Sequence, residues 1–440
     1  MQAHWKHVRN SMPILLIFLC FSTTQAAGLP GSSSIQTTGS IQYPSLKVGI
    51  YAVSWNFNEY NADTIANTFD LSQSWWVGPP PSSNDPSAKM DQVHSLKPDY
   101  KALVYRNVNW IYDYWPDELA IANDSGWLLK NVNGQYVRDT VYSGDYLVDI
   151  TNKSYQQWLG AKIESWLVQY PFFDGVFTDG GLTTGLKDWD GTASSAPLNP
   201  STGTDFTDQE IMDGCAAMLN AIMDAIGPNK LVVANGIWNG AVWSSSQGNG
   251  YKYILSKAPR LNGVMSEGCF KPYGSQWLSE AEWLSSIDLV SWIQNNFLNE
   301  SGKHFVAGCP ASPSLPSGAT TGQVMMYGFS STLLSAKYSS AQNTVFFDVN
   351  FWNSTQYPTE LPLVQRLGDL DMIGPIGNYY KVPSTSIYVR DFVKGRVLVN
   401  PSGLAFTVPL DGTYTDFFAN ATVASSVTIL PHTGMILISP

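Results

Sequence analysis

The chain has few charged residues and few cysteines for its 440 residues. Charged side chains make up 13% of it, about half of the share in an average soluble protein. The 24 Lys and Arg are outnumbered by 35 Asp and Glu, which gives a net charge of −11. No basic surface for nucleic acid or an anionic membrane is therefore expected. Four cysteines in a chain of this length do not form a disulfide framework.

Several catalytic motifs are absent as well. The sequence contains no HxH or HExxH zinc motif, no GxSxG nucleophile elbow, no P-loop and no GxGxxG turn. Only His94, His304 and His432 follow the first 26 residues, and they lie far apart. Cys269 has no histidine near it in sequence, so core packing is favoured over a nucleophile. We expect no metal and no organic cofactor, although a structural Ca²⁺ stays open.

The first 26 residues have the pattern of a secretory signal. A basic head (His4 to Arg9) precedes an apolar run (Pro13 to Phe21) and a small polar stretch (Ser22 to Ala27). The apolar run is shorter than the ~18 residues that span a bilayer, so cleavage near Ala26 or Ala27 is favoured over an uncleaved anchor. Residues 27–45 are predicted to be a flexible linker. We therefore expect a secreted or cell-surface protein without stable membrane insertion, which five glycosylation sequons would suit: Asn123, Asn152, Asn299, Asn353 and Asn420.

The middle of the chain alternates short β-forming runs with helical segments. Eight runs are Lys47–Trp55, Thr68–Trp76, Lys101–Val108, Phe173–Asp179, Lys230–Ile237, Leu261–Cys269, His304–Cys309 and Thr344–Asn350. Helical periodicity covers Ser154–Tyr170, Asp208–Ile226, Trp277–Phe297 and Gln323–Tyr338. Eight βα units predict an α/β fold, a closed (β/α)₈ TIM barrel over residues 46–375. The alternative, an open doubly wound sheet, would need a Gly-rich turn after the first strand, which residues 53–56 lack.

Beyond Pro375 the pattern changes to short alternating strands without helical periodicity. These are Ser386–Phe392, Arg396–Asn400, Ala405–Pro409, Gly412–Phe417, Ala424–Leu430 and Met435–Ser439. Residues 376–440 are therefore predicted to form a small antiparallel β-sandwich.

Two acidic residues stand at strand ends, where the working residues of such barrels lie. Asp179 ends the fourth run and Glu267 ends the core of the sixth, and each precedes glycine. Strands four and six are two apart, so these carboxylates can face each other across a sugar, as glycosidic cleavage requires. The alternative for each is a helix cap or a loop contact. Residues expected to stack on a sugar or bond its hydroxyls are Tyr51, Trp55, Asp70, Arg106, Asn107, Asn235, Trp238 and Asp348.

Four segments carry a family resemblance: VGIYAVSW, FDGVFTDG, VMSEG and VRDFVKGRVLVNPS. From Lys47 to Ser439 the chain resembles glycoside hydrolase-like family fifteen, whose members combine a barrel with a small β domain. That resemblance implies hydrolysis of glycosidic bonds. The strand layout is also similar to clan D, the alpha-galactosidase-like barrels, which implies that Asp179 is the nucleophile and Glu267 the acid/base. This chain departs from that clan, which has Asp at strand six.

The expected function is a secreted glycoside hydrolase that acts on an extracellular polysaccharide or glycan. A catalytically inactive carbohydrate-binding or cell-envelope protein on the same barrel is the alternative, and a transglycosidase would use the same residues. Substrate, linkage, stereochemistry and oligomeric state stay open at this point. So does a Cys269–Cys309 bridge, although buried free thiols are favoured.

Overall fold

The computed structural model describes residues 46, 48–54, 60–74, 86–139, 142, 144–185, 196–299, 302–310, 315–336, 344–348, 360–372 and 374–440. All of them belong to one compact unit, Tyr43–Pro440. The predicted signal and linker, Trp55 and the sequon at Asn353 lie outside the described residues.

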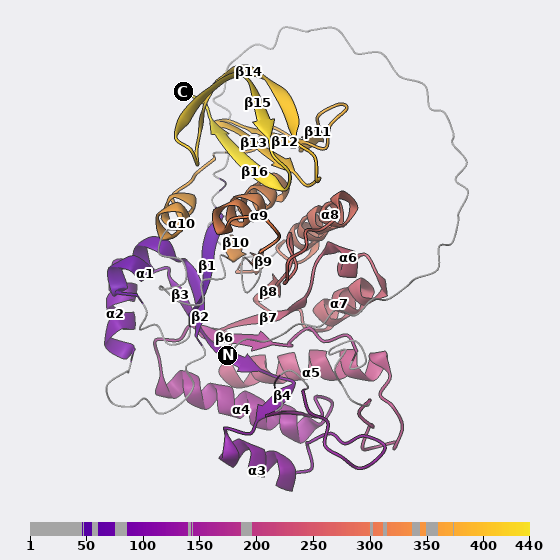
Figure 1. Cartoon of the computed structure of the whole chain (residues 1–440). Coiled ribbons are helices and arrows are strands. Elements are labelled where there is room, and N and C mark those ends of the chain that lie inside the picture. Colours follow the sequence, from indigo (N-terminus) through magenta and orange to yellow (C-terminus); the bar gives the residue numbers. More distant parts are fainter. Residues whose placement is uncertain are drawn as a thin grey trace, which may run out of the picture. The chain divides into compact units, whose positions relative to one another are not determined.

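Eight parallel strands close into a barrel (Figure 1), as the sequence predicts. They are β1 (Gly49–Ser54), β2 (Leu71–Ser74), β3 (Lys101–Asn107), β6 (Gly175–Asp179), β7 (Leu231–Ile237), β8 (Gly263–Ser266), β9 (His304–Gly308) and β10 (Thr344–Asp348). Each pairs with its neighbour in this series, and β10 pairs with β1. Each strand falls within one of the eight predicted runs. The second run was too long, because Thr68 ends a helix and β2 begins at Leu71.

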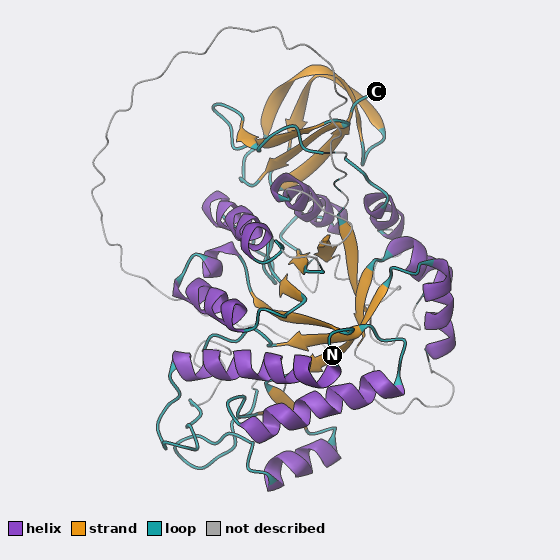
Figure 2. Ribbon diagram, turned by 180° about the vertical axis from the view of Figure 1, so that it is seen from behind, coloured by secondary structure: helices purple, strands orange, loops and turns teal. Residues whose placement is uncertain are grey.

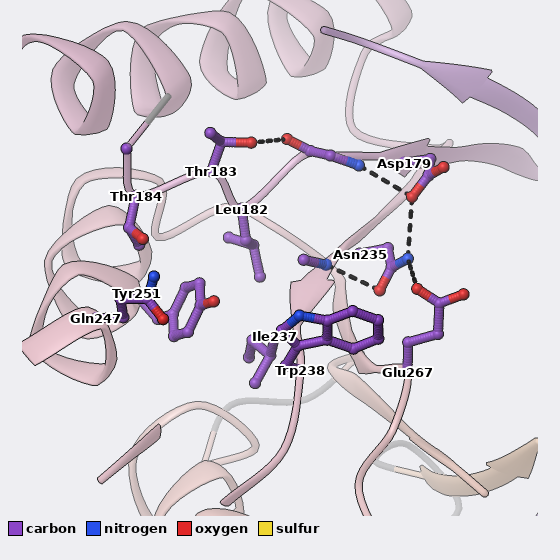
Figure 3. A pocket seen from close by; sticks show the side chains of 13 residues that line it. Asp179, Leu182, Thr183, Thr184, Asn235, Ile237, Trp238, Gln247, Tyr251 and Glu267 are labelled. Carbon is purple, nitrogen blue, oxygen red and sulfur yellow. Dashed lines mark hydrogen bonds between the residues drawn. The ribbon is translucent and has the colours of Figure 1, made fainter. Parts of the chain in front are cut away.

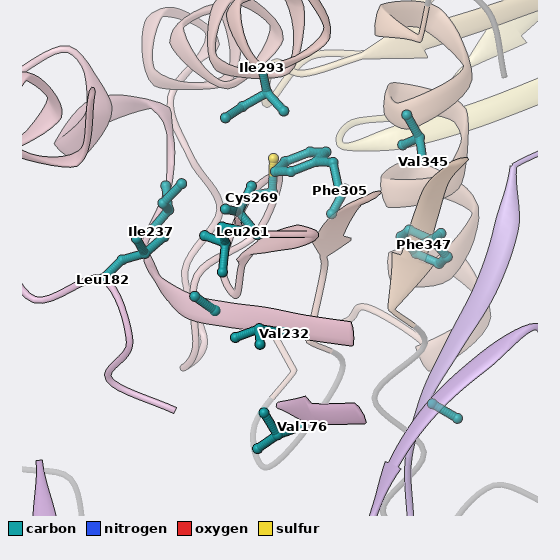
Figure 4. Close-up of a cluster of buried hydrophobic side chains, with 14 of the residues drawn as sticks. Val176, Leu182, Val232, Ile237, Leu261, Cys269, Ile293, Phe305, Val345 and Phe347 are labelled. Atoms are coloured by element: carbon teal, nitrogen blue, oxygen red, sulfur yellow. The ribbon is translucent and has the colours of Figure 1, made fainter. Parts of the chain in front are cut away.

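Side chains of the barrel strands alternate between two cores, because successive residues of a strand point to opposite faces. Inward residues such as Leu103, Phe177 and Val233 form a small cluster inside the barrel. Outward residues such as Val176 and Val232 belong to the larger core under the helices (Figure 4). This alternation decides which residue at each strand end faces the barrel mouth.

Helices surround the strands in both views (Figures 1 and 2). They are α1 (Ala62–Thr68), α2 (Ser87–Leu96), α3 (Pro116–Asp124), α4 (Lys153–Gln169), α5 (Asp208–Ile226), α6 (Gly240–Trp243), α7 (Ser246–Lys257), α8 (Glu280–Asn296), α9 (Thr321–Ser335) and α10 (Leu361–Gly368). The four predicted helices correspond to α4, α5, α8 and α9. Capping boxes begin α5, at Thr207 and Glu210, and α8, at Ser279 and Glu282.

One unpredicted excursion leaves the barrel between β3 and α4. It contains the antiparallel pair β4 (Trp110–Tyr112) and β5 (Asp145–Leu147), with α3 between them. Its first residues follow the mouth end of β3, so the excursion stands beside the strand that carries Tyr105 and Asn107.

The C-terminal residues form an antiparallel six-stranded sheet, as predicted. Its strands are β11 (Tyr380–Lys381), β12 (Tyr388–Phe392), β13 (Gly395–Asn400), β14 (Phe406–Asp416), β15 (Ala421–Ile429) and β16 (Thr433–Ile438), in the order β11-β12-β13-β16-β14-β15. The two runs predicted at 405–417 are a single strand, β14, whose register shifts between Pro409 and Thr413. Helix α9 packs against β13 and β16 and so joins the sheet to the barrel.

The three cysteines in the described part of the chain, Cys215, Cys269 and Cys309, are buried and free, so no Cys269–Cys309 bridge is formed. Within the same residues, no helix has the length and apolar character needed to cross a bilayer.

Candidate active site

Asp179 and Glu267 meet at the mouth of the barrel through a shared partner, Asn235 (Figure 3). Asp179 is the last residue of β6, Asn235 lies on β7, and Glu267 follows β8. The Nδ2 atom of Asn235 donates to Oδ1 of Asp179 and to Oε2 of Glu267, both at 3.0 Å. Two oxygens bound to one nitrogen are separated by no more than twice 3.0 Å, or 6.0 Å. With 120° between the two N–H bonds of a planar amide, the separation is about 5.2 Å.

The orientation of the Asn235 amide follows from its neighbours. The backbone N–H of Gly236 can only donate, so it must face the amide oxygen of Asn235, and the amide nitrogen then faces the two carboxyl groups. On the other side, Oδ1 of Asn235 accepts from the backbone N–H of Gly236 at 2.8 Å. Gly236 has φ 143° and sits where the β7–β8 register shifts. A Cβ there would lie 2.7 Å from the carbonyl oxygen of Leu182, so only glycine fits this bulge.

Asp179 is surrounded by four hydrogen-bond donors. Its Oδ2 accepts from the hydroxyl of Tyr105 at 2.6 Å and from Nδ2 of Asn107 at 3.4 Å. Its Oδ1 accepts from Asn235 and from the backbone N–H of Gly180, both at 3.0 Å. Four donors occupy the four acceptor positions of this carboxylate.

Glu267 has a different environment. Asn235 and the hydroxyl of Tyr273, which donates to Oε1 at 2.7 Å, are its two hydrogen-bond donors among the residues described. Burial and the negative charge of Asp179 raise the pKa of Glu267, and the two hydrogen bonds only partly oppose this. The pair therefore consists of one carboxylate with a full set of donors and one buried carboxyl group whose pKa is raised.

A cavity of about 140 Å³ opens beside the pair. Its walls come mainly from the segments after β6 and β7, and the lining residues are Asp179, Gly180, Leu182, Thr183, Thr184, Gly185, Asn235, Gly236, Ile237, Trp238, Gln247, Tyr251 and Glu267. Trp238 is 46% exposed, so its ring is free to stack on a ligand. The carbonyl of Trp238 accepts from the N–H of Gly268 and from Oγ of Ser266, both at 2.9 Å, which ties its loop to the Glu267 segment.

Two expected sugar-binding residues lie away from this cavity, and their predicted role is corrected. Arg106 points outward from β3, is 0% exposed, and donates to Glu118 at 2.9 Å beneath the ring of Trp115. Asp70 precedes β2 and so lies at the opposite end of the barrel. It accepts from the N–H of Ile50 at 2.7 Å and pairs with Lys97 at 2.5 Å. Neither side chain is placed to reach a ligand beside Asp179.

Three further candidates lie near the pair but do not line the cavity. Tyr51 is 0% exposed and packs inside the barrel against Phe177, so it is not the stacking platform that we expected. Burial and the charges of Asp348, Glu267 and Asp179 raise the pKa of Tyr51. Asp348 is a buried residue at the end of β10. Asn107 is buried too and acts on Asp179 rather than on the cavity.

Two tyrosines at the site were missed from sequence. Tyr105 precedes Asn107 by two positions and therefore faces the same way, a signal that strand alternation provides. Tyr273 lies in the loop six residues after Glu267, and no periodic pattern marks it. Over the residues described, no group of three or more His, Cys, Asp and Glu could hold a metal ion.

Comparison with known proteins identifies one family. Residues 94–396 match the model of hypothetical glycosyl hydrolase family 15. No curated protein matches the chain.

Solved structures share the fold at low sequence identity. A noncanonic maltogenic alpha-amylase from Thermotoga neapolitana has 10% identity and a TM-score of 0.50, over 89% of this chain and 98% of that one. A GH27 β-L-arabinopyranosidase from Geobacillus stearothermophilus, solved with arabinose, has 11% identity and a TM-score of 0.50, over 91% and 98%. A Thermus thermophilus protein, Ttha1563, has 9% identity and a TM-score of 0.50, over 90% and 99%. At such identities these neighbours establish the barrel architecture and nothing finer.

Proposed function

The chain belongs to hypothetical glycosyl hydrolase family 15, and from this premise we propose that it is a retaining glycoside hydrolase. Asp179 is the nucleophile, and Glu267 is the general acid and base. The observation that carries this proposal is the sharing of one amide, Asn235, by two carboxylates with unequal donor sets.

The separation of the carboxylates supports retention of configuration. Retaining enzymes place the two carboxyl groups about 5 to 5.5 Å apart, while inverting enzymes leave about 6.5 to 9.5 Å for a water molecule. The upper limit of 6.0 Å set by Asn235 falls below the inverting range. The inverting reaction must fit both the sugar and an attacking water molecule between the carboxyl groups, and the shorter separation found here matches direct attack by one of them.

The reaction then proceeds in two balanced steps. A carboxylate oxygen of Asp179 bonds to the anomeric carbon, the bond to the leaving glycosidic oxygen breaks, and Glu267 gives its proton to that oxygen. In the second step Glu267, now ionised, takes a proton from water. The water oxygen bonds to the anomeric carbon, and the Asp179 carboxylate is released. The protonated start of Glu267 agrees with its raised pKa.

The cavity suggests how a sugar is held. One wall carries the exposed ring of Trp238 beside Leu182 and Ile237, which suits the apolar face of a sugar ring. Thr184 and Gln247 provide a hydroxyl and an amide group for sugar hydroxyls. With the signal-like N-terminus of the sequence, this favours an extracellular polysaccharide or glycan as substrate.

A purely carbohydrate-binding role is the weaker candidate. Binding of a neutral sugar does not require two carboxylates within 6.0 Å, which repel each other when both are ionised. Such pairs of unlike carboxyl groups are typical of acid–base catalysis.

A substrate panel tests the proposal. The purified protein is assayed on 4-nitrophenyl glycosides and on fluorescently labelled glycans, with Asp179→Asn and Glu267→Gln beside it. We expect Asp179→Asn to lose at least about 10³-fold in kcat/KM on every substrate that is cleaved, while it still binds them. Glu267→Gln should lose as much on glycans, whose leaving oxygen needs a proton, and less on the activated 4-nitrophenyl glycosides. The matched control is Glu164→Gln, an exposed glutamate on α4. Undiminished turnover in either carboxylate variant would reject the assignment.

A further inference from the structure

The loop that follows β8 is fixed to the barrel by a buried lysine. Lys271 is 0% exposed, and its ammonium donates to the carbonyl oxygens of Pro272 at 3.0 Å, Gly274 at 2.9 Å and Pro310 at 3.0 Å. Three donors thus meet three acceptors, which satisfies the buried charge. Two acceptors belong to the loop itself and one to the segment after β9. The loop is therefore held firmly on both sides of Tyr273.

Tyr273 extends from this loop to the proposed acid. Its hydroxyl donates to Oε1 of Glu267 at 2.7 Å, and its ring meets that of Trp238 edge to face at 6.1 Å. Burial and the charge of Glu267 raise the pKa of Tyr273 well above its usual value. The phenol therefore keeps its proton near neutral pH and remains available as a hydrogen-bond donor.

The two partners of Glu267 differ in chemistry. The Asn235 nitrogen can only donate, and it is shared with Asp179, so it stabilises negative charge on either carboxylate. The Tyr273 hydroxyl serves Glu267 alone, and it can donate or accept. Hydrogen bonds to an ionised acceptor are about twice as strong as those between neutral groups. The contact from Tyr273 therefore strengthens as Glu267 loses its proton.

We propose that Tyr273 is a positioning residue for the acid–base step, which orients Glu267 through Oε1 and stabilises the carboxylate that forms as its proton passes to the leaving oxygen. This inference rests on the proposed glycoside hydrolase function. The proton of Tyr273 stays on its phenol throughout. Tyr273 should affect the rate of the first chemical step, in which Glu267 protonates the leaving oxygen. This rate depends more strongly on the acid when the leaving group is more basic.

The test is a leaving-group series with Tyr273→Phe. Aryl glycosides from 2,4-dinitrophenyl to phenyl, built on whichever sugar the wild-type protein cleaves, are assayed across pH. We expect kcat/KM to fall about tenfold for the phenyl glycoside and less than about twofold for the dinitrophenyl glycoside, which departs without protonation. Because a donor that favours the ionised form is lost, the alkaline limb of the kcat/KM profile should move up by about one pH unit.

Two further variants of the protein serve as a control and as a test in the opposite direction. Tyr253→Phe removes a hydroxyl that donates to Asp213 at 2.6 Å on the exposed surface, and it should leave both the series and the profile unchanged. Site-specific 3-fluorotyrosine at position 273 keeps the ring and strengthens the donor, so the alkaline limb should move to lower pH. This opposite shift guards against a fold defect in the phenylalanine variant.

The outcomes separate the two claims. If the wild-type protein cleaves no member of the panel, the proposed function fails. If it cleaves them and the Tyr273→Phe loss is equal across leaving groups with an unmoved alkaline limb, Tyr273 is merely structural and this inference is overturned. The inference is supported if the loss of kcat/KM in Tyr273→Phe grows with the basicity of the leaving group. The alkaline limb must also move to higher pH in Tyr273→Phe and to lower pH with 3-fluorotyrosine.

Discussion

Replacement of Glu267 by Gln should make the protein more stable at neutral pH. Burial and Asp179 raise the pKa of Glu267 in the folded protein above its value in the unfolded chain, which is about 4.3. When the pKa of a group is higher in the folded than in the unfolded protein, protonation of that group stabilises the fold. For Glu267 this stabilisation is complete below the unfolded pKa and is lost as the pH rises through the folded pKa. Above that range the ionised Glu267 destabilises the fold, and a neutral glutamine avoids this. Its amide can donate to the Tyr273 hydroxyl and accept from Asn235.

The size of the effect follows from the geometry at Asn235. Two unit charges about 5.2 Å apart repel by about 3 kcal/mol at an effective dielectric constant of ~20, and by about 0.8 kcal/mol in water. The compact unit Tyr43–Pro440 has roughly 400 residues, so its unfolding entropy is about 0.8 kcal/mol/K. Relief of the repulsion should therefore raise Tm by about 1 to 4 °C at pH 7 to 8.

The assay is differential scanning calorimetry of the wild-type protein, Glu267→Gln and the surface control Glu164→Gln from pH 4 to pH 8. The gain for Glu267→Gln should shrink toward zero as the pH falls to 4, where Glu267 is mostly protonated in the folded and the unfolded states. The control should stay within about 1 °C of the wild type throughout. A lower Tm for Glu267→Gln at pH 7, or an equal offset at pH 4 and pH 8, would refute the repulsive pair.

Three further outcomes are expected. Arg106→Met should cost about 3 to 5 kcal/mol of unfolding free energy in urea titrations and leave KM unchanged, because the lost cation is buried beside Glu118 and away from the cavity; a changed KM with intact stability would contradict its structural role. Trp238→Ala should raise KM for a glycan about tenfold and change kcat little, as expected for a lost stacking surface; an unchanged KM would remove it from the binding site. The three buried thiols should not react with Ellman's reagent until the protein unfolds, since burial raises their pKa values; reaction of the native protein would show that they are accessible.

The barrel and its carboxylate pair were predictable because both follow from simple periodicities. Strands buried on both faces are continuous β-forming runs, and all eight stood out between helical segments. In a closed barrel their C-terminal ends converge, so the sequence predicts that Asp179, Asn235 and Glu267 lie at the same end of the barrel. The distance between the carboxylates was not accessible, because it depends on the bulge at Gly236 that aims the Asn235 amide.

The structure differs from the sequence-based predictions where the face of a residue or the limit of a strand decides its position. In Lys101–Asn107, Tyr105 and Asn107 face inward and Arg106 faces outward. Strict alternation along this strand therefore predicts Tyr105, and not Arg106, as a residue of the site. Asp70 lies before β2 and not at its mouth end, because Ala62–Thr68 is helical and the strand begins only at Leu71. Tyr273 reaches Glu267 through a loop that a buried lysine holds, and such a long-range contact leaves no local pattern.

Chemical trapping of the covalent intermediate tests the assignment of Asp179 as the nucleophile most directly. The wild-type protein is incubated with a fluorinated glycosyl fluoride of the sugar that it cleaves, and the labelled peptide is identified by mass spectrometry. We expect one glycosyl group per chain, attached through an ester to Asp179. A label on Glu267, or hydrolysis that gives the inverted anomer with no covalent intermediate, would contradict this assignment.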